Sequence, residues 1–228
     1  SFSVQKRMRE YLENKLLPPH TKLDKGADPY DEKSYEKYTQ KQYAPDLMYR
    51  EILSFVEESK DEPFVLFWTT PVPHVPLQAP EKWVDHYRAK LGDEEPYIGD
   101  KDYFPCRYPR ATYAAMVSYW DEQIGGLVAK LKELRIYDNT IIIFTSDNGP
   151  TFNGGTDSPY FDSAKPFKSE FGWGKASLRE GGIRVPMIAS WPGHIPAGTT
   201  SDLLSAFWDM MPTMCDIAGI ASPATDGI

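Results

Sequence analysis

Two adjacent side chains, Asp147 and Asn148, have the chemical types that could hold a metal ion. Side-chain oxygens are the ligands that hard cations such as Ca²⁺ and Mg²⁺ prefer in proteins. Two oxygens cannot complete such a site, since Ca²⁺ takes about 6–8 of them, so further ligands would have to come from elsewhere. The alternative is a plain turn, because Asp-Asn-Gly is a common turn tripeptide.

A histidine and a lysine could supply proton transfer and positive charge. His74 lies between Pro73 and Pro76, which restrict the backbone, and imidazole is the usual general acid or base near neutral pH. Lys175 follows Gly174, a residue that lets a ligand approach the backbone closely. The ammonium group of the lysine could then hold an anionic oxygen. Either side chain could instead be an ordinary structural or surface residue.

Other residues that look reactive have structural interpretations. Cys106 is followed by Arg107 and Arg110, and neighbouring arginines lower the pKa of a thiol. The surrounding stretch is rich in aromatic residues and proline, which favours a structural role for this cysteine. Glu180 and Arg184 form an opposite-charge pair that we expect to support its loop. The sequence contains neither a G-x-S-x-G nucleophile motif nor a G-x-x-x-x-G-K-[ST] phosphate loop.

The spacing of apolar residues predicts three helices that would position these side chains. The first begins with Asp46 as its N-cap. The second carries an apolar stripe over 113–134 and is interrupted by Gly125 and Gly126. The last spans 209–218, between an aspartate cap and a glycine just past its end.

Continuous apolar runs predict three strands, over 64–69, 140–145 and 185–191. Such runs are typical of parallel strands that are covered on both faces. The order of helices and strands predicts an α/β fold with a mostly parallel sheet flanked by helices. Ligands bind beyond the carboxyl ends of such strands. We therefore expect His74 and the Asp147-Asn148 pair to share one crevice.

Charge and composition exclude several classes of protein. The 228-residue chain has a net charge of −8, which argues against a nucleic-acid partner because such proteins show basic patches. No run approaches the roughly 18 apolar residues of a membrane span, and two cysteines are too few for a disulfide framework. Residues 1–45 are polar. They predict an irregular segment with a short helix over 4–16, in the same domain as 46–228.

Three motifs, in this order, resemble those of type I, formylglycine-dependent sulfatases of the alkaline phosphatase superfamily. They are Pro73-His74-Val75-Pro76, then Thr145-Ser146-Asp147-Asn148-Gly149-Pro150, then Gly174-Lys175 followed by Glu180-Gly181-Gly182-Ile183-Arg184-Val185-Pro186. The match covers roughly 45–228, and the combination is highly specific. It implies the central and C-terminal part of a sulfatase catalytic domain with an alkaline-phosphatase-like core.

The resemblance implies a sulfuric ester hydrolase that acts on a sulfated carbohydrate or an aryl sulfate. Asp147 and Asn148 would ligate Ca²⁺, with Mg²⁺ as the alternative, Lys175 would bind the sulfate, and His74 would protonate the leaving alcohol. The family's nucleophile motif, C-x-P-S-R or S-x-P-S-R, does not occur in the sequence. The formylglycine is therefore expected on a residue outside this chain, and the chain alone is expected to be inactive.

The resemblance also implies a periplasmic, extracellular or lysosomal compartment and a sulfated small molecule or glycan as partner. Trp173 is expected either to stack on a sugar ring or to be buried. Two other functions stay open. One is a phosphodiesterase or phosphonate hydrolase of the same superfamily, which a two-metal site would favour, and the other is a non-catalytic relative that binds sulfated glycans.

Overall fold

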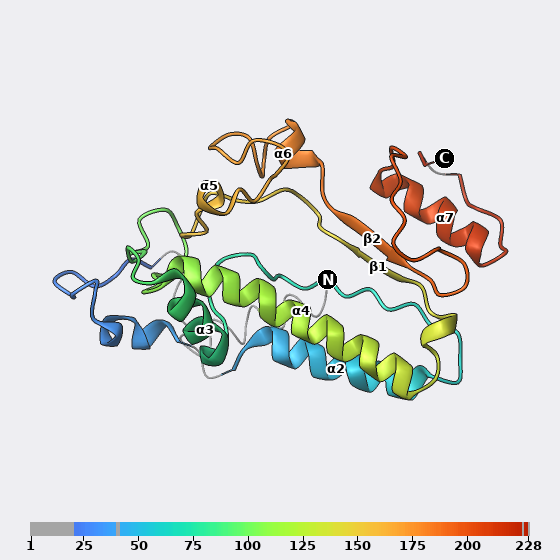
Figure 1. The fold of residues 1–228 in the computed structure, drawn as a ribbon, viewed down its shortest axis with the longest axis horizontal. Coiled ribbons are helices and arrows are strands. Elements are labelled where there is room, and N and C mark those ends of the chain that lie inside the picture. The colour runs from blue at the N-terminus through green and yellow to red at the C-terminus, as the bar shows by residue number, and fades with distance from the viewer. Residues whose placement is uncertain (1–20, 40–41, 225, 228) are drawn as a thin grey trace. The chain divides into compact units, whose positions relative to one another are not determined.

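The structure is a computed structural model that describes residues 21–39, 42–224 and 226–227 (Figure 1). The helix expected over 4–16 lies outside the described residues. The chain divides into two compact units, Ser1–Pro192 and Gly193–Ile228. All the residues singled out above as candidate site residues belong to the first unit.

Three helices form the framework of the first unit. They are α2 (Ala44–Ser59), α3 (Glu81–Leu91) and α4 (Pro109–Glu133), and both α2 and α3 pack along α4 (Figure 1). The helix predicted over 113–134 is confirmed as α4. A side chain at Gly126 would collide with the hydroxyl of Tyr49 on α2. The close approach of the two helices therefore explains a glycine inside a long helix.

The start of α2 differs from the sequence prediction. Tyr43, not Asp46, is the N-cap, and Pro45 occupies the first turn, where proline is favoured because its fixed φ suits a helix. Asp46 therefore lies inside the helix. Its carboxylate accepts hydrogen bonds from the hydroxyl of Tyr119 and, at 3.3 Å, from the amide of Gln123 on α4, so it joins two helices instead of capping one.

Helix α3 was not predicted, because it presents no buried apolar stripe to α4. Polar and aromatic groups join the two helices instead. Glu122 of α4 accepts hydrogen bonds from the indole of Trp83 at 2.6 Å and from Lys82 at 2.8 Å. A proline before the helix and a glycine with φ +76° after it, Pro80 and Gly92, are the sequence signals that could have shown its limits.

The N-terminus of α4 is capped by a residue from another segment. The N-cap Tyr108 makes no side-chain capping bond. The carboxylate of Glu94 instead accepts hydrogen bonds from the backbone N–H groups of Arg110, at 2.6 Å, and Ala111, at 2.9 Å. These are among the four N–H groups that a helix start leaves unpaired. Burial raises the pKa of Glu94, while these two bonds oppose the rise.

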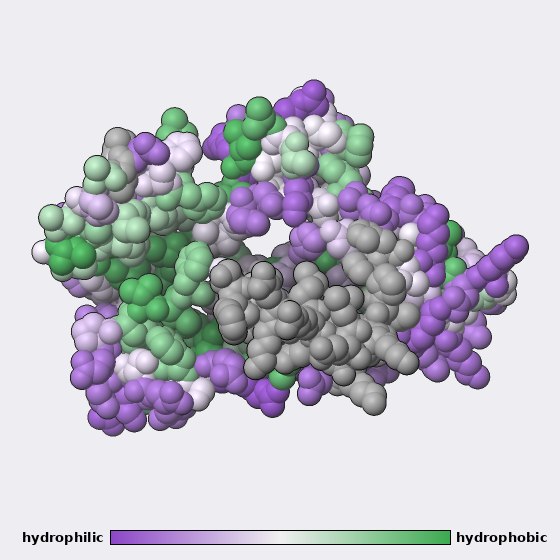
Figure 2. Space-filling view, turned by 180° about the vertical axis from the view of Figure 1, so that it is seen from behind, coloured by the Kyte–Doolittle hydropathy of each residue, from purple (hydrophilic) through white to green (hydrophobic). Residues whose placement is uncertain are grey.

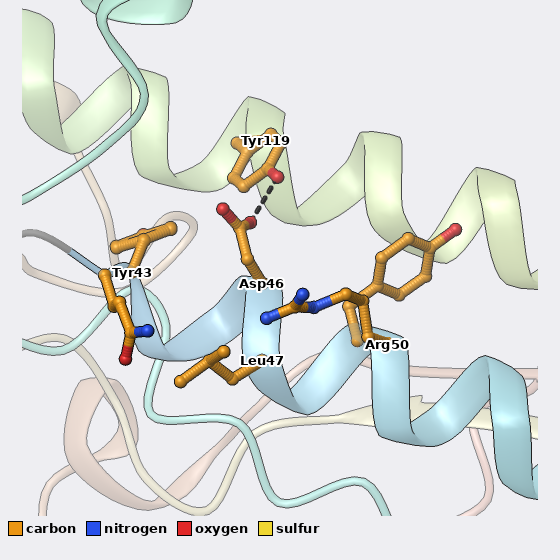
Figure 3. Close-up of a pocket in the computed structure, with 7 residues that line it drawn as sticks. Tyr43, Asp46, Leu47, Arg50 and Tyr119 are labelled. Atoms are coloured by element: carbon orange, nitrogen blue, oxygen red, sulfur yellow. Dashed lines mark hydrogen bonds between the residues drawn. The ribbon is translucent and has the colours of Figure 1, made fainter.

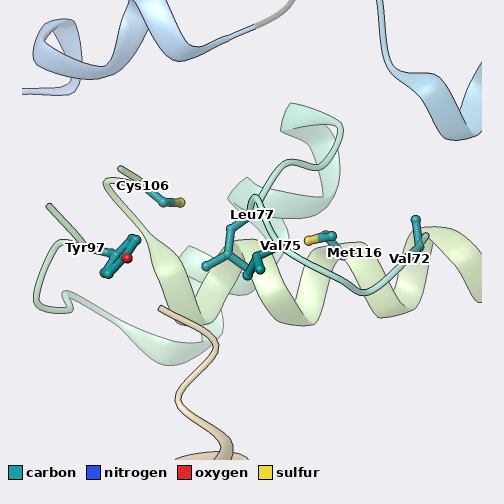
Figure 4. Close-up of a cluster of buried hydrophobic side chains, with 6 residues drawn as sticks. All are labelled: Val72, Val75, Leu77, Tyr97, Cys106 and Met116. Atoms are coloured by element: carbon teal, nitrogen blue, oxygen red, sulfur yellow. The ribbon is translucent and has the colours of Figure 1, made fainter. Parts of the chain in front are cut away.

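The main hydrophobic core of the unit lies between α4 and the segment that follows residue 70. Figure 4 shows its six buried side chains: Val72, Val75, Leu77, Tyr97, Cys106 and Met116. Three of them lie on the segment 72–77 and face α4. Tyr97 and Cys106 pair through an isolated antiparallel bridge. The turn that carries His74 is therefore fixed to the core on both sides.

Two of the three predicted strands are present. β1 (Ile142–Thr145) and β2 (Met187–Ser190) pair antiparallel, with Ile142 opposite Ser190 and Thr145 opposite Met187. Within the described residues this pair is the whole sheet, so the mostly parallel sheet expected from the sequence is not built by these residues. β1 is half-buried and β2 is largely exposed.

The strand predicted over 64–69 is absent from the structure, although the backbone there is not helical. Phe64 and Trp68 contact Phe55 and Tyr49 of α2, with ring centroids 5.7 and 6.1 Å apart. Val65, between them, is 92% exposed. The expected burial on both faces is wrong because, among the described residues, no strand pairs with this run.

Hydrophobic side chains also reach the surface elsewhere in the chain. Figure 2 shows them beside hydrophilic residues on the face turned away from the viewer in Figure 1. No helix in the described part of the chain is long and apolar enough to cross a membrane.

Several short helices complete the described residues. The segment expected to be irregular contains a 3-10 helix, η1 (Glu32–Tyr38), which Asp31 caps through the N–H of Lys33 at 3.0 Å. A further 3-10 helix, η2 (Tyr137–Asn139), lies shortly before β1.

The second unit, taken by itself, contains η3 (Phe207–Asp209) and α7 (Met210–Ile217). α7 has Asp209 as N-cap and Gly219, at φ +67°, just past its end. The sequence prediction of this helix is therefore confirmed.

Candidate functional site

The predicted metal ligands lie in a bend directly after β1. Ser146 shapes this bend, because its hydroxyl donates to the carbonyl oxygen of Asn148 at 2.9 Å. The amide nitrogen of Asn148 donates to the carbonyl oxygen of Gly149 at 3.0 Å, so the amide oxygen is the atom of this side chain that remains to accept or to coordinate. Asp147 is exposed. Within the described residues, neither the carboxylate of Asp147 nor this amide oxygen has a hydrogen-bond partner.

Lys175 is held beside this bend by the backbone. Its N–H donates to the carbonyl oxygen of Pro150 at 2.8 Å, and the N–H of Gly149 donates to the carbonyl oxygen of Gly182 at 3.0 Å. A Cβ at Gly149 would collide with the carbonyl oxygen of Gly181. The two motifs therefore pack backbone against backbone, a contact that only glycine allows.

The ion pair expected beside Lys175 is present. Glu180 begins the short helix α6 (Glu180–Ile183), and its carboxylate lies 3.1 Å from the guanidinium of Arg184. The guanidinium also lies 4.8 Å from the ring centroid of Phe167. The predicted pair is therefore present, while its role in supporting the loop stays a prediction. Because both side chains are exposed, the pair contributes little to stability.

His74 is exposed, and its ring has a defined hydrogen bond. Nδ1 lies 2.7 Å from the carbonyl oxygen of Val75, and a carbonyl can only accept, so Nδ1 carries a proton. Within the described residues Nε2 has no partner. The ring also meets the edge of Tyr103, with centroids 5.6 Å apart. Cis peptide bonds precede Pro73 and Pro76 on either side.

The His74 turn contacts the loop that continues from the Asp147-Asn148 bend. A Cβ at Gly154 would lie 2.5 Å from Val75, and a Cβ at Gly155 would lie 2.8 Å from Tyr97. Both partners are core residues, so the loop rests on the core only a few residues beyond the bend. The bend and the Lys175 segment therefore meet backbone against backbone, whereas the loop beyond the bend reaches the His74 turn through its contact with the side chain of Val75.

The donor atoms at the bend suit a hard cation but form only part of a site. A carboxylate and an amide oxygen are typical Ca²⁺ ligands. Among the described residues, no group of three or more His, Cys, Asp or Glu side chains could hold a metal ion. Asp147 and Asn148 can therefore contribute two ligands, and the others would have to come from outside this group.

Cys106 is not a reactive thiol. It is buried, and its Sγ donates to the hydroxyl of Thr112 at 3.3 Å. Burial raises the pKa of this thiol to about 11, and the nearby Arg107 lowers it by less. The structural role favoured by the sequence is confirmed.

A cavity of about 470 Å³ lies between α2 and α4, away from the three motifs. Figure 3 shows Tyr43, Asp46, Leu47, Arg50 and Tyr119 around it, with the hydrogen bond between Asp46 and Tyr119. None of the four predicted site residues lines this cavity. The position of this cavity therefore does not coincide with the candidate catalytic residues.

Trp173 is half-buried, and two cationic side chains lie against its ring. The ammonium of Lys168 lies 4.6 Å from the ring centroid, and the guanidinium carbon of Arg179 lies 4.1 Å from it. Arg179 was not among the site residues that the sequence predicted. The density of cations around a tryptophan was the signal that could have found it.

A family model described as Sulfatase matches residues 18–220. The chain belongs to the sulfatase family. It is 32% identical over 189 residues to the N-acetylgalactosamine-6-sulfatase of Sus scrofa, covering 78% of this chain and 30% of that enzyme. It is also 32% identical over 181 residues to the Arylsulfatase H of Homo sapiens, covering 76% and 27%.

A solved structure supports the same fold. The crystal structure of Ps i-CgsB in complex with k-i-k-neocarrahexaose matches with a TM-score of 0.67 and 30% sequence identity, covering 96% of this chain and 42% of that chain. The predicted α/β fold of the alkaline-phosphatase-like sulfatases is thereby confirmed. This sulfatase chain spans about three tenths of the length of the two curated relatives above.

Proposed function

We propose that this chain supplies part of the active site of a sulfuric ester hydrolase that removes sulfate from a sulfated carbohydrate or an aryl sulfate. One observation carries the proposal. The backbone bonds from Lys175 to Pro150 and from Gly149 to Gly182 hold the segment that carries this lysine against the bend that carries two unpaired oxygen ligands. Membership of the sulfatase family gives this arrangement its chemical meaning.

Asp147 and Asn148 would hold Ca²⁺, or Mg²⁺ in its place. A bound cation of this kind stabilises negative charge that develops on a sulfate oxygen. The hydrogen bond from the amide nitrogen of Asn148 to Gly149 fixes the amide so that its oxygen is the atom left to coordinate. Fixed ligands lower the free energy needed to reorganise the site during the reaction.

Lys175 would bind a sulfate oxygen. Its backbone is fixed by the bond to Pro150, while its half-buried side chain has no carboxylate partner within the described residues. The full positive charge of the lysine is therefore available to an anionic ligand.

His74 would protonate the alcohol that leaves. Because Nδ1 donates to the carbonyl oxygen of Val75, the proton that moves is the one on Nε2 of the imidazolium. The fixed orientation aims this atom in one direction, as general acid catalysis requires. The nucleophile, a formylglycine, would be supplied by a residue outside these 228 residues, since the sequence lacks the motif.

The test uses the full-length gene product that carries this chain and 4-nitrophenyl sulfate as substrate. We expect Lys175→Ala to lower kcat/KM by about 10²–10³-fold, as removal of a transition-state donor does. Lys165→Ala is the matched control, since Lys165 is an exposed lysine of the same loop, and its rate should equal that of the wild type. Asp147→Asn should lower the affinity for Ca²⁺ measured by calorimetry.

Three results would contradict the proposal. Equal rates for Lys175→Ala and Lys165→Ala would exclude Lys175 from the site. Hydrolysis of bis(4-nitrophenyl) phosphate or a phosphonate monoester at a much higher kcat/KM than 4-nitrophenyl sulfate would indicate the phosphodiesterase or phosphonate hydrolase instead. Binding of a sulfated glycan without turnover of any of these esters would indicate a non-catalytic relative.

A further inference from the structure

The segment 165–184 is locally basic although the whole chain is acidic. It contains five cationic side chains and two carboxylates, whereas the chain as a whole has a net charge of −8. The cations are Lys165, Lys168, Lys175, Arg179 and Arg184, and the carboxylates are Glu170 and Glu180. A local excess of one sign concentrates oppositely charged ligands at that place.

Ion pairs use only two of these five cations. Lys165 lies 3.9 Å from Asp162, and Arg184 lies 3.1 Å from Glu180. Within the described residues, Lys168, Lys175 and Arg179 have no carboxylate partner. Lys175 is assigned above to the sulfate that is removed, which leaves Lys168 and Arg179 without a function.

Trp173 gathers these two cations at one place. Both charged groups lie within 5 Å of its ring centroid, and cations are attracted to the negative face of an indole. Arg179 is fixed further by a hydrogen bond to the carbonyl oxygen of Gly172 at 3.2 Å. Neither cation has a carboxylate partner within the described residues, so the positive charge of each stays available to an anionic group.

The backbone of this group rests on a glycine of the candidate site. A Cβ at Gly181 would lie 2.6 Å from the carbonyl oxygen of Trp173 and 2.8 Å from that of Lys168. The same glycine contacts Gly149 in the bend that carries the predicted metal ligands. The two cations and the candidate site therefore share one rigid piece of backbone.

We infer that Lys168, Trp173 and Arg179 form a second anion-binding subsite, which receives another sulfate or a carboxylate of the same glycan. This inference rests on the proposed function and narrows its substrate to carbohydrates with at least two negative groups. Trp173 acts as the support that orders the two cations. It does not act as a stacking platform for a sugar ring, because its ring already binds cations.

The test compares two substrates in the full-length gene product: 4-nitrophenyl sulfate and an oligosaccharide that carries two or more sulfates. We expect Arg179→Ala to lower the ratio of kcat/KM for the oligosaccharide to that for the aryl sulfate by roughly tenfold to a hundredfold, the effect of one charge-assisted hydrogen bond. Trp173→Leu should lower the ratio as well, because it removes the support. Lys165→Ala is the control and should leave the ratio unchanged.

Arg179→Lys separates recognition from folding, because it keeps the charge and loses only the planar guanidinium. We expect it to restore part of the ratio that Arg179→Ala loses. An unchanged ratio in both Arg179→Ala and the double variant Lys168→Ala/Arg179→Ala would overturn the subsite while leaving the sulfatase proposal intact.

Direct binding keeps the inference testable even if the wild type hydrolyses neither substrate. In that case calorimetry with dextran sulfate would be used on the wild type and on the double variant. Weaker binding by the double variant, with a smaller dependence on salt concentration, is the supporting result. Equal affinities and equal salt dependence would overturn the subsite.

Discussion

The two parts of the candidate site are held in place by different means. The His74 turn is anchored by side chains, since Val72, Val75 and Leu77 are buried against α4. The Asp147-Asn148 bend and Lys175 are anchored by backbone contacts, in which glycine backbones lie where any side chain would collide. The His74 turn therefore depends on the apolar side chains that it buries, and the bend with Lys175 depends on glycines that have no side chain.

This difference predicts how each part should respond to substitution. A buried side chain can be shortened at the cost of a cavity, and the structure relaxes partly around it. A backbone contact has no comparable freedom, because the colliding atom is a carbonyl oxygen and not the end of a flexible side chain. The glycine contacts should be the less tolerant of the two.

The largest effect is expected at the glycine contact. Gly149→Ala places a Cβ against the carbonyl oxygen of Gly181 and should lower the free energy of unfolding by about 3 kcal/mol, the upper range for overpacking. Urea unfolding followed by circular dichroism measures this change. Gly125→Ala is the matched control, since no atom lies within 4 Å of its added Cβ, and it should stabilise α4 by about 1 kcal/mol.

A smaller loss is expected at the side-chain anchor. Val75→Ala removes two methyl groups from a buried position and should cost about 2 kcal/mol through lost burial and the cavity left behind. Val65→Ala, at a position that is 92% exposed, should change the free energy of unfolding by less than about 0.5 kcal/mol. If Val75→Ala destabilises more than Gly149→Ala, the proposed order of the two anchors is reversed.

The cap on α4 should contribute less again. Glu94→Gln keeps one accepting oxygen and loses the other, so one of the two capping hydrogen bonds is lost and we expect a cost of about 1 kcal/mol. The pKa of Glu94 is raised in the folded state, so the wild type should lose stability relative to this variant as the pH rises from the unfolded carboxyl pKa through the raised folded value. Denaturant midpoints between pH 4 and pH 8 measure the trend, and the opposite slope would mean that the capping bonds outweigh burial.

The smallest effect is expected at the exposed ion pair. Glu180→Gln removes the partner of Arg184, and exposed pairs contribute about 0–1 kcal/mol. The Tm should therefore change by nearly the same amount between low and high salt in the wild type and in Glu180→Gln, as thermal unfolding would measure. A shift as large as that of Val75→Ala would show that this pair, and not glycine packing, holds the Lys175 loop.

The sequence predicted the local backbone packing of the motifs better than it predicted the framework around them. The glycines of the third motif indicated close backbone approach, and the structure shows such an approach at Gly149 and Gly181. The sequence alone could not show that Glu94 caps a helix that begins about sixteen residues further along the chain, because that hydrogen bond depends on the path of the chain in space. Nor could it show α3, whose contacts with α4 are polar and aromatic rather than periodic and apolar.

The predicted strands show most clearly what an apolar sequence pattern cannot predict. The run 64–69 is at least as apolar as 140–145, yet only the second forms a strand, because β2 supplies its hydrogen bonds. An apolar pattern reports which side chains avoid water. It does not report whether a neighbouring backbone is present to pair with, and pairing depends on residues distant in the chain.

The exposed run between Pro63 and Pro71 has one further consequence. Val65 and Phe67 project from a non-helical, uncharged stretch whose backbone has no neighbouring strand among the described residues. Short apolar segments of this kind template cross-β growth, and flanking prolines limit it because they cannot donate to a ladder. These residues would therefore be the place where solutions of the chain begin to form fibrils, and the two prolines would act as gatekeepers that confine the growth.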